Sequence, residues 1–205
     1  MNNRAADRMF KKAEAALVKS FFSPRGVFCL RNVTVMGLMI GFTAILSRFG
    51  TIYITPTFRI TFAYLPGAAV AMLFGPWAAL VFGFASDFVG YITNPVGAYF
   101  PGFAISDMVH YFIYACFFYK RPYKFLPVLI KAVAARLLFV AVIVMGLNYF
   151  WMSILTGAVA GSYFTGARLI SNLALLPVHA LLIAYTCKLL ERVKPYIFSH
   201  WRGKA

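Results

Sequence analysis

The chain has 205 residues, of which 62% are hydrophobic and 12% are charged, and its formal net charge is +15. Because soluble domains carry about 25% charged residues, this chain has too few polar groups to cover a water-facing surface, which excludes an ordinary soluble domain. The basic residues gather beside apolar segments, a placement that argues against nucleic-acid binding and follows the positive-inside pattern of membrane proteins. The composition therefore predicts a polytopic membrane protein.

The first 31 residues form a basic segment with seven Lys or Arg residues. In RAADRMFKKAEAALVKSFF (4–22) the apolar side chains fall roughly on one helical face with lysines opposite, which predicts a short helix on the inner membrane surface. A frayed basic tail is the alternative. The segment lacks a short apolar core followed by a small-residue cleavage site, so we expect no cleaved signal peptide.

Six apolar segments follow, each near the roughly 20 residues that a helix needs to cross a bilayer. They cover residues 33–49, 60–75, 77–92, 99–119, 125–147 and 166–190. The Gly75-Pro76 pair predicts a tight turn between the second and third segments. Residues 148–165 are expected to form a loop with a short interfacial helix, and a seventh crossing is the alternative.

The charge distribution favours six crossings with both termini in the cytosol. Basic clusters before residue 32, in KRPYK (120–124) and after residue 187 then all lie on the inner side, while the predicted outer segments hold only Arg59. The predicted organisation is a basic cytosolic segment (1–31), an all-α six-helix transmembrane bundle (32–192) and a basic cytosolic tail (193–205). We expect a multi-pass protein of the cell membrane.

Ionisable side chains inside a membrane are costly and usually face a cavity or a partner. Those that the topology leaves unexplained are Arg48, Arg59, Asp87, Asp107, His110, Lys131, Arg136, Arg168 and His179. We interpret Lys131 and Arg136 as structural and His179 as a satisfied buried histidine. Asp107 and His110 share a helical face, but two ligands make a poor metal site, so we expect no metal.

The other charged residues, with the aromatic rings around them, predict a chamber that opens outward and suits an anionic, aromatic solute. Arginine binds carboxylates in a bidentate manner, and aromatic rings stack on flat solutes. The alternatives are that the arginines reach lipid headgroups, that the aspartates pair with them structurally, and that the rings form an interfacial belt.

Several functional motifs are missing from the sequence. It has no Gly-rich phosphate loop ending in Lys-Ser/Thr, no HExxH and no GxSxG. We therefore expect a binding bundle that takes its energy from partners and is not an enzyme. In GLMIG (37–41), Gly37 and Gly41 lie four residues apart and would allow another helix to approach closely.

Three strings together resemble the substrate-binding S components of energy-coupling factor (ECF) vitamin transporters, and within them the folate-specific (FolT-like) branch. The strings are GLMIGFTAILSRF (37–49), FRITFAYLPGAAVAMLFGPWAALVFGFASDFVGY (58–91) and GAYFPGFAISD (97–107). The resemblance implies a six-helix bundle that captures folate from outside a prokaryotic cell. It also implies a transmembrane coupling subunit and two cytosolic ATPases as partners, with ATP used by those partners and no cofactor in this chain.

For a folate ligand, the resemblance and the residue chemistry together suggest site residues. Phe62, Tyr64, Tyr99 and Phe103 would stack on the rings, Asp87 or Asp107 with Asn172 would hydrogen-bond the pterin edge, and Arg48, Arg59 or Arg168 would pair with the carboxylates. In the family, an Ala-xxx-Ala pair on the first helix contacts the coupling subunit, and here Gly37 and Gly41 take those positions.

Other functions stay open from the sequence. An S component for another vitamin or a pyrimidine precursor would present a similar set of side chains. A membrane-embedded, lipid-modifying enzyme would need clustered catalytic carboxylates or a metal site. A purely structural or interaction protein would show no saturable binding of a small molecule.

Overall fold

The computed structural model describes residues 29–53, 59–93, 95, 99–119, 125–157, 166 and 168–198. The predicted N-terminal surface helix and the last residues of the basic tail lie outside the described residues. The elements are α2 (Leu30–Phe49), β1 (Thr51–Tyr53), β2 (Arg59–Thr61), α3 (Tyr64–Phe74), α4 (Pro76–Thr93), α5 (Pro101–Phe118), α6 (Phe125–Phe139), the π-helix η1 (Val140–Asn148), α7 (Tyr149–Thr156) and α9 (Leu176–Phe198).

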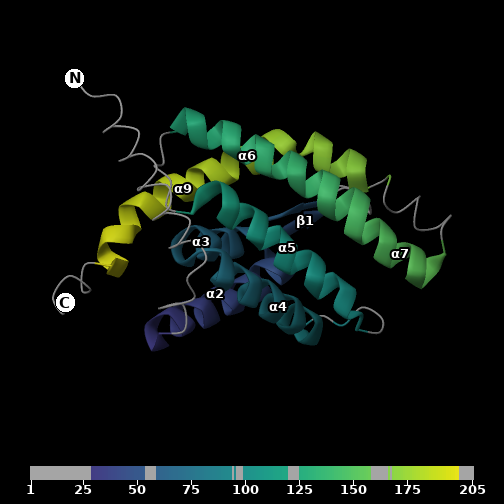
Figure 1. The fold of residues 1–205 in the computed structure, drawn as a ribbon, viewed down its shortest axis with the longest axis horizontal. Helices are drawn as coiled ribbons and strands as arrows, with labels where there is room; N and C mark the ends of the chain where they lie inside the picture. Colours follow the sequence, from purple (N-terminus) through teal and green to yellow (C-terminus); the bar gives the residue numbers. More distant parts are fainter. Residues whose placement is uncertain are drawn as a thin grey trace, which may run out of the picture.

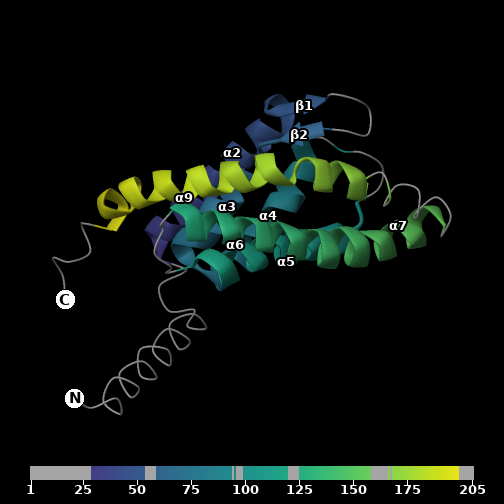
Figure 2. The same ribbon diagram turned by 90° about the horizontal axis from the view of Figure 1, so that it is seen from above.

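The helices form a bundle in which neighbours in sequence are mostly neighbours in space. Helix α5 lies between α4 and the continuous stretch formed by α6 and η1 (Figure 1). Helix α9 runs alongside α6 (Figure 2). Helix α2 packs on α3 and α4 at the other side of the bundle. The described part of the chain is helical apart from one short hairpin, which confirms the predicted all-α class.

The hairpin precedes α3 and was not predicted. Strands β1 and β2 are antiparallel, with Thr51 opposite Thr61 and Tyr53 opposite Arg59. The hydroxyl of Thr51 donates to that of Thr61 at 3.3 Å. The prediction of a helix from residue 60 is therefore wrong, since α3 begins only at Tyr64. Threonine and isoleucine favour extended backbone, and the apolar run alone does not distinguish a strand from a helix.

The predicted turn at Gly75-Pro76 is confirmed. Gly75 has a φ of 90°, a conformation that favours glycine, and its missing Cβ would lie 2.9 Å from the ring of Tyr119. Pro76 is the first residue of α4, where its missing N–H costs no hydrogen bond. This turn allows α3 and α4 to pack directly against each other.

The stretch after residue 147 differs from the prediction. Helices α6, η1 and α7 are continuous, and residues Leu126–Leu155 form one apolar stretch of 30 residues. A short helix does occur in the stretch 148–165, at Tyr149–Thr156, but no loop separates it from η1, so that part of the prediction is wrong. Residues 158–165 lie outside the described part of the chain.

The last predicted helix is bent. Its parts, Arg168–Ala174 and Leu176–Val193, meet at 57°. Pro177 lies in the first turn of α9 and has no N–H to donate to the carbonyl of Leu173, so a regular helix cannot continue through this point.

Within the described residues, two helices are long and apolar enough to cross a membrane, Asn32–Phe49 and Leu126–Leu155, and the bent pair makes a third if it forms one span. Helix α3 has only 11 residues, which is short for a full crossing. The count of six crossings stays a prediction.

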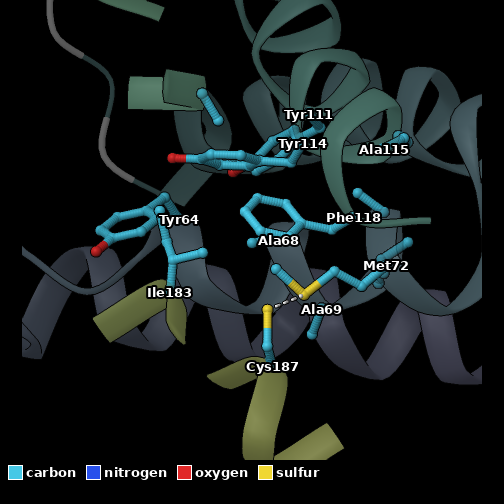
Figure 3. Close-up of a cluster of buried hydrophobic side chains, with 14 of the residues drawn as sticks. Tyr64, Ala68, Ala69, Met72, Tyr111, Tyr114, Ala115, Phe118, Ile183 and Cys187 are labelled. Carbon is cyan, nitrogen blue, oxygen red and sulfur yellow. Dashed lines mark hydrogen bonds between the residues drawn. The ribbon is translucent and has the colours of Figure 1, made fainter. Parts of the chain in front are cut away.

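The core is formed by small residues of α3 facing aromatic residues of α5. Ala68 and Tyr114 have no exposed surface, and Phe118 is 1% exposed. Figure 3 shows these rings above Met72, whose Sδ lies 3.5 Å from the Sγ of Cys187 on α9. Large apolar side chains elsewhere, along α2 above all, point away from the bundle, as a lipid-facing surface requires.

Gly83 permits a close contact of α4 with the backbone of α5, since a Cβ there would lie 2.6 Å from the Cα of Met108. Backbone cannot yield as a side chain does, so we expect Gly83→Ala to force α4 and α5 apart. The expected loss is about 1–3 kcal/mol of unfolding free energy, measured as a lower thermal midpoint in detergent. Gly90→Ala is the matched control, because its Cβ would meet nothing within 4 Å. Equal midpoints for the two variants would contradict this packing.

Candidate functional site

A buried arginine lies at the centre of the bundle, where α3, α5, α6 and the bent last helix converge. Arg136 is only 3% exposed. Its Nη2 donates to Oδ1 of Asn172 at 2.9 Å and contacts Nδ1 of His179, and its Nη1 reaches the hydroxyl of Tyr114 at 3.5 Å. We call this group, with Tyr64 and His110, the central polar cluster.

Aromatic rings enclose the guanidinium. Its Cζ lies 4.5 Å from the ring centroid of Phe139 and 5.7 Å from that of Tyr64. The ring of Tyr64 in turn meets His179 edge to face at 5.1 Å. His110 lies against Phe139, with 4.3 Å between their ring centroids. Cation–π attraction in such a dry site offsets part of the cost of burying the charge.

The contact with Arg136 determines the tautomer of His179. A guanidinium has only N–H donors, so Nδ1 of His179 must be the acceptor in their contact. The proton of the neutral ring then resides on Nε2, which is a donor. That Nε2 is buried and has no hydrogen-bond partner within the described structure.

Unpartnered polar atoms gather in this cluster. Within the described residues, the hydroxyl of Tyr64, Nε2 of His110, Nε of Arg136 and Nε2 of His179 are all buried without a hydrogen-bond partner. Each such group costs about 1–3 kcal/mol if it stays unpaired. The hydrogen-bond partners that the structure gives Arg136 are all neutral. The cluster therefore has spare donors for a polar group from outside the chain, either water or a ligand.

A second polar group lies where α4 ends and α5 begins. Asp87 and Tyr99 lie close enough to hydrogen-bond each other. Oδ2 of Asp87 and the hydroxyl of Tyr99 are buried, and neither makes a hydrogen bond of standard geometry within the described residues. The carboxyl groups of Asp87 and Asp107 are close enough to interact as well. The rings of Tyr91 and Phe88 lie 5.1 and 6.0 Å from that of Tyr99. We call Asp87, Tyr99 and Asp107 the α4–α5 acidic group.

Helix α7 packs against the start of α5. Nε1 of Trp151 donates to Oγ of Ser106 at 3.2 Å, and its ring lies 5.5 Å from that of Phe100. Near Trp151 in the chain, Oδ1 of Asn148 and Oγ of Ser153 are buried and unpartnered within the described structure. The predicted loop is thus a helix that brings polar atoms to the bundle.

The structure brings several predicted site residues together. Tyr64 and Asn172 meet in the central polar cluster, and Asp87, Tyr99 and Asp107 form the acidic group. Phe103 packs on Phe100, with 5.9 Å between the ring centroids, at the same end of α5. Phe62 is half-buried just before α3, and its backbone N–H donates to the carbonyl of Gly50 at 3.3 Å.

The structure describes the side chains of two of the three predicted carboxylate-binding arginines. Arg48 is exposed in the last turn of α2. Arg168 is half-buried, and its carbonyl accepts from Nδ2 of Asn172 at 2.8 Å. The backbone of Arg59 lies in β2, but its side chain lies outside the described residues.

Gly37 and Gly41 are exposed on α2, and a Cβ at either position would meet nothing within 4 Å. In the described structure, that face of the helix is open.

Arg136 was predicted to be structural and His179 to be a satisfied buried histidine, but their contact with each other was not predicted. Two signals pointed to them. Asn172 and His179 are seven residues apart, which is two helical turns and the same face. Arg136 lies in an apolar stretch with no acidic residue near it in the chain, and such a charge is usually functional.

Comparisons with known proteins show which family the chain resembles. The family model for the ECF transporter substrate-specific component matches residues 31–192. The chain is 36% identical over 165 residues to the folate transporter FolT of Clostridium novyi (strain NT), covering 80% of this chain and 92% of that protein. It is also similar to a crystal structure of FolT bound with folic acid, with a TM-score of 0.67 and 27% identity over 78% of this chain and 94% of that one.

Both the family model and the relative cover most of the chain, and they describe a transporter component rather than an enzyme. The chain belongs to the family of substrate-specific components of ECF transporters.

Proposed function

We propose that this protein is the folate-binding S component of an ECF importer, which captures the vitamin outside the cell. A transmembrane coupling subunit and two cytosolic ATPases would supply the energy for its delivery. The likeness to FolT, in sequence and in a folic-acid-bound structure, supports folate as the ligand. The observation that carries the proposal is the set of buried polar atoms that lack a partner within the described part of this chain.

The flat rings of folate would bind near the α4–α5 acidic group. A carboxylate of Asp87 or Asp107 accepts hydrogen bonds from the amino edge of a pterin, and the half-buried ring of Tyr99 stacks on it. Phe103 and Phe62 would contact the remaining ring surface. The Tyr64 hydroxyl and Asn172 would complete the polar contacts from the centre of the bundle.

The glutamate carboxylates would pair with arginines. Arg168 is the strongest candidate because it lies one turn from Asn172 and is half-buried, where a charge-assisted hydrogen bond is stronger than at the surface. Arg48 and Arg59 would act closer to the membrane surface, at the end of α2 and in the hairpin.

Six crossings with both termini in the cytosol remain the topology that we propose, in the cell membrane of a prokaryote. The basic clusters support it, because all of them then lie on the inner side. Residues 1–31 and 193–205 would be cytosolic segments around a membrane domain at 32–192.

Removing the Arg168 side chain tests the carboxylate assignment. We expect Arg168→Ala to weaken folate binding about tenfold, since a hydrogen bond to a charged group is worth about 1.5–3 kcal/mol. Pteroate, which lacks the glutamate, should bind the variant as well as the unaltered protein. Titration of tryptophan fluorescence in detergent measures both. If neither Arg168→Ala nor Arg48→Ala lowers folate affinity, the carboxylate assignment is wrong. If the unaltered protein does not bind folate saturably, the proposed function is wrong.

The hydroxyl of Tyr64 should matter for the ligand and not for the fold. It is buried without a partner, so Tyr64→Phe should raise the unfolding free energy of the ligand-free protein by about 1 kcal/mol while weakening folate binding. Tyr114→Phe is the matched control, because its hydroxyl accepts from Arg136 and its loss should destabilise the ligand-free protein. Thermal unfolding with and without folate compares the two. A destabilised Tyr64→Phe protein would argue against this role.

Larger residues on the open face of α2 should block binding of the coupling subunit without changing folate binding. Gly37→Leu and Gly41→Leu add side chains where the described structure has space, so folate affinity should stay unchanged. Co-purification with the coupling subunit should be lost, because close helix contact needs small residues. Leu38→Ala, a change at a neighbouring exposed position, is the control. Intact assembly of both glycine variants would place the contact elsewhere.

A further inference from the structure

We propose that Arg136 is a positioning residue that sets the bend of the last helix and orients Asn172 for the ligand. The part of this proposal that concerns ligand affinity rests on the proposed function, whereas the part that concerns the bend does not.

One nitrogen of Arg136 connects the two halves of the bent helix. Asn172 lies in Arg168–Ala174 and His179 lies in α9, and the halves meet at 57°. Nη2 of Arg136 donates to Oδ1 of Asn172 and contacts Nδ1 of His179. Because Nη2 carries two N–H groups, it can donate one to each half.

The backbone does not fix the bend by itself. Pro177 removes a hydrogen bond at the break, so the angle between the halves depends on contacts with other elements. Arg136 supplies a rigid contact of this kind, because its guanidinium is planar and its Cζ lies 4.5 Å from the ring centroid of Phe139. Helix α6, which carries Arg136, runs alongside α9 (Figure 2).

The same contacts fix the amide of Asn172. Its Oδ1 accepts from Arg136 and its Nδ2 donates to the carbonyl of Arg168 at 2.8 Å. One N–H of Nδ2 remains for a ligand. Without Arg136 the amide could rotate, and the ligand would meet a residue that is no longer oriented.

The bend is measured without any ligand. Spin labels on cysteines introduced at Ile170 and Leu189, which are 69% and 53% exposed, report the distance between the two halves in the full-length protein in lipid nanodiscs. Cys29 and Cys116 are exposed and are replaced by serine, while Cys187 is buried and is kept. We expect one narrow distance distribution in the otherwise unaltered protein and a broad or shifted one in Arg136→Gln.

Two further variants sharpen the test. Lys131→Gln removes a cation from the same helix outside the cluster and should leave the distribution narrow. His179→Leu removes the contact of Arg136 with α9 but keeps its contact with Asn172, so it should broaden the distance distribution. This variant keeps the proposal testable if Arg136→Gln fails to fold. Narrow distributions at the unaltered distance in every variant that folds would overturn the proposal.

Folate affinity tests the part of the proposal that concerns the orientation of Asn172. Arg136→Gln should weaken folate binding about tenfold, as expected when a buried polar contact is lost. Asn172→Ala should do the same, and the double variant should be no weaker than the single ones, because coupled residues are not additive. If the double variant loses folate affinity by the product of the two single losses, the positioning role is overturned. If the unaltered protein binds no folate, the proposed function fails, while the distance measurement still decides on the bend.

Discussion

The structure depends on one buried cation, the guanidinium of Arg136, whose hydrogen-bond partners are neutral. Taking a charge out of water costs several kcal/mol, so the surrounding elements must offset that cost. Tyr64 of α3, Tyr114 of α5, and Asn172 and His179 of the last helix all contact it through hydrogen bonds or ring faces. The position of four helices is thus tied to one side chain.

The rest of the fold follows from a membrane setting. Small residues of α3 and the close contact at Gly83 let the helices pack tightly inside, while large apolar side chains face outward. Polar atoms inside such a bundle have no bulk water to satisfy them. The unpartnered atoms of the central polar cluster and the α4–α5 acidic group are therefore the places where a ligand gains most from binding.

The apolar runs and the Gly75-Pro76 turn were enough to predict α2, α4 and α5 closely, because hydropathy and backbone limits are local properties. The hairpin at β1 and β2 was missed because an apolar strand and an apolar helix look alike over a few residues. The link of α7 to η1 was missed because glycines and polar residues in the stretch 148–165 suggested a loop, whereas the helix continues as far as Thr156. Tyr64 and Asn172 were predicted as site residues and both contact Arg136. The contact of Arg136 with His179 joins residues 43 apart, which no local pattern reveals.

The most direct test of the account is titration of the purified protein with folate, riboflavin, thiamine and biotin in parallel. A folate-binding S component predicts saturable binding of folate at one site and no response to the other three vitamins. Equal responses to several vitamins, or saturable binding of another one in place of folate, would contradict the account.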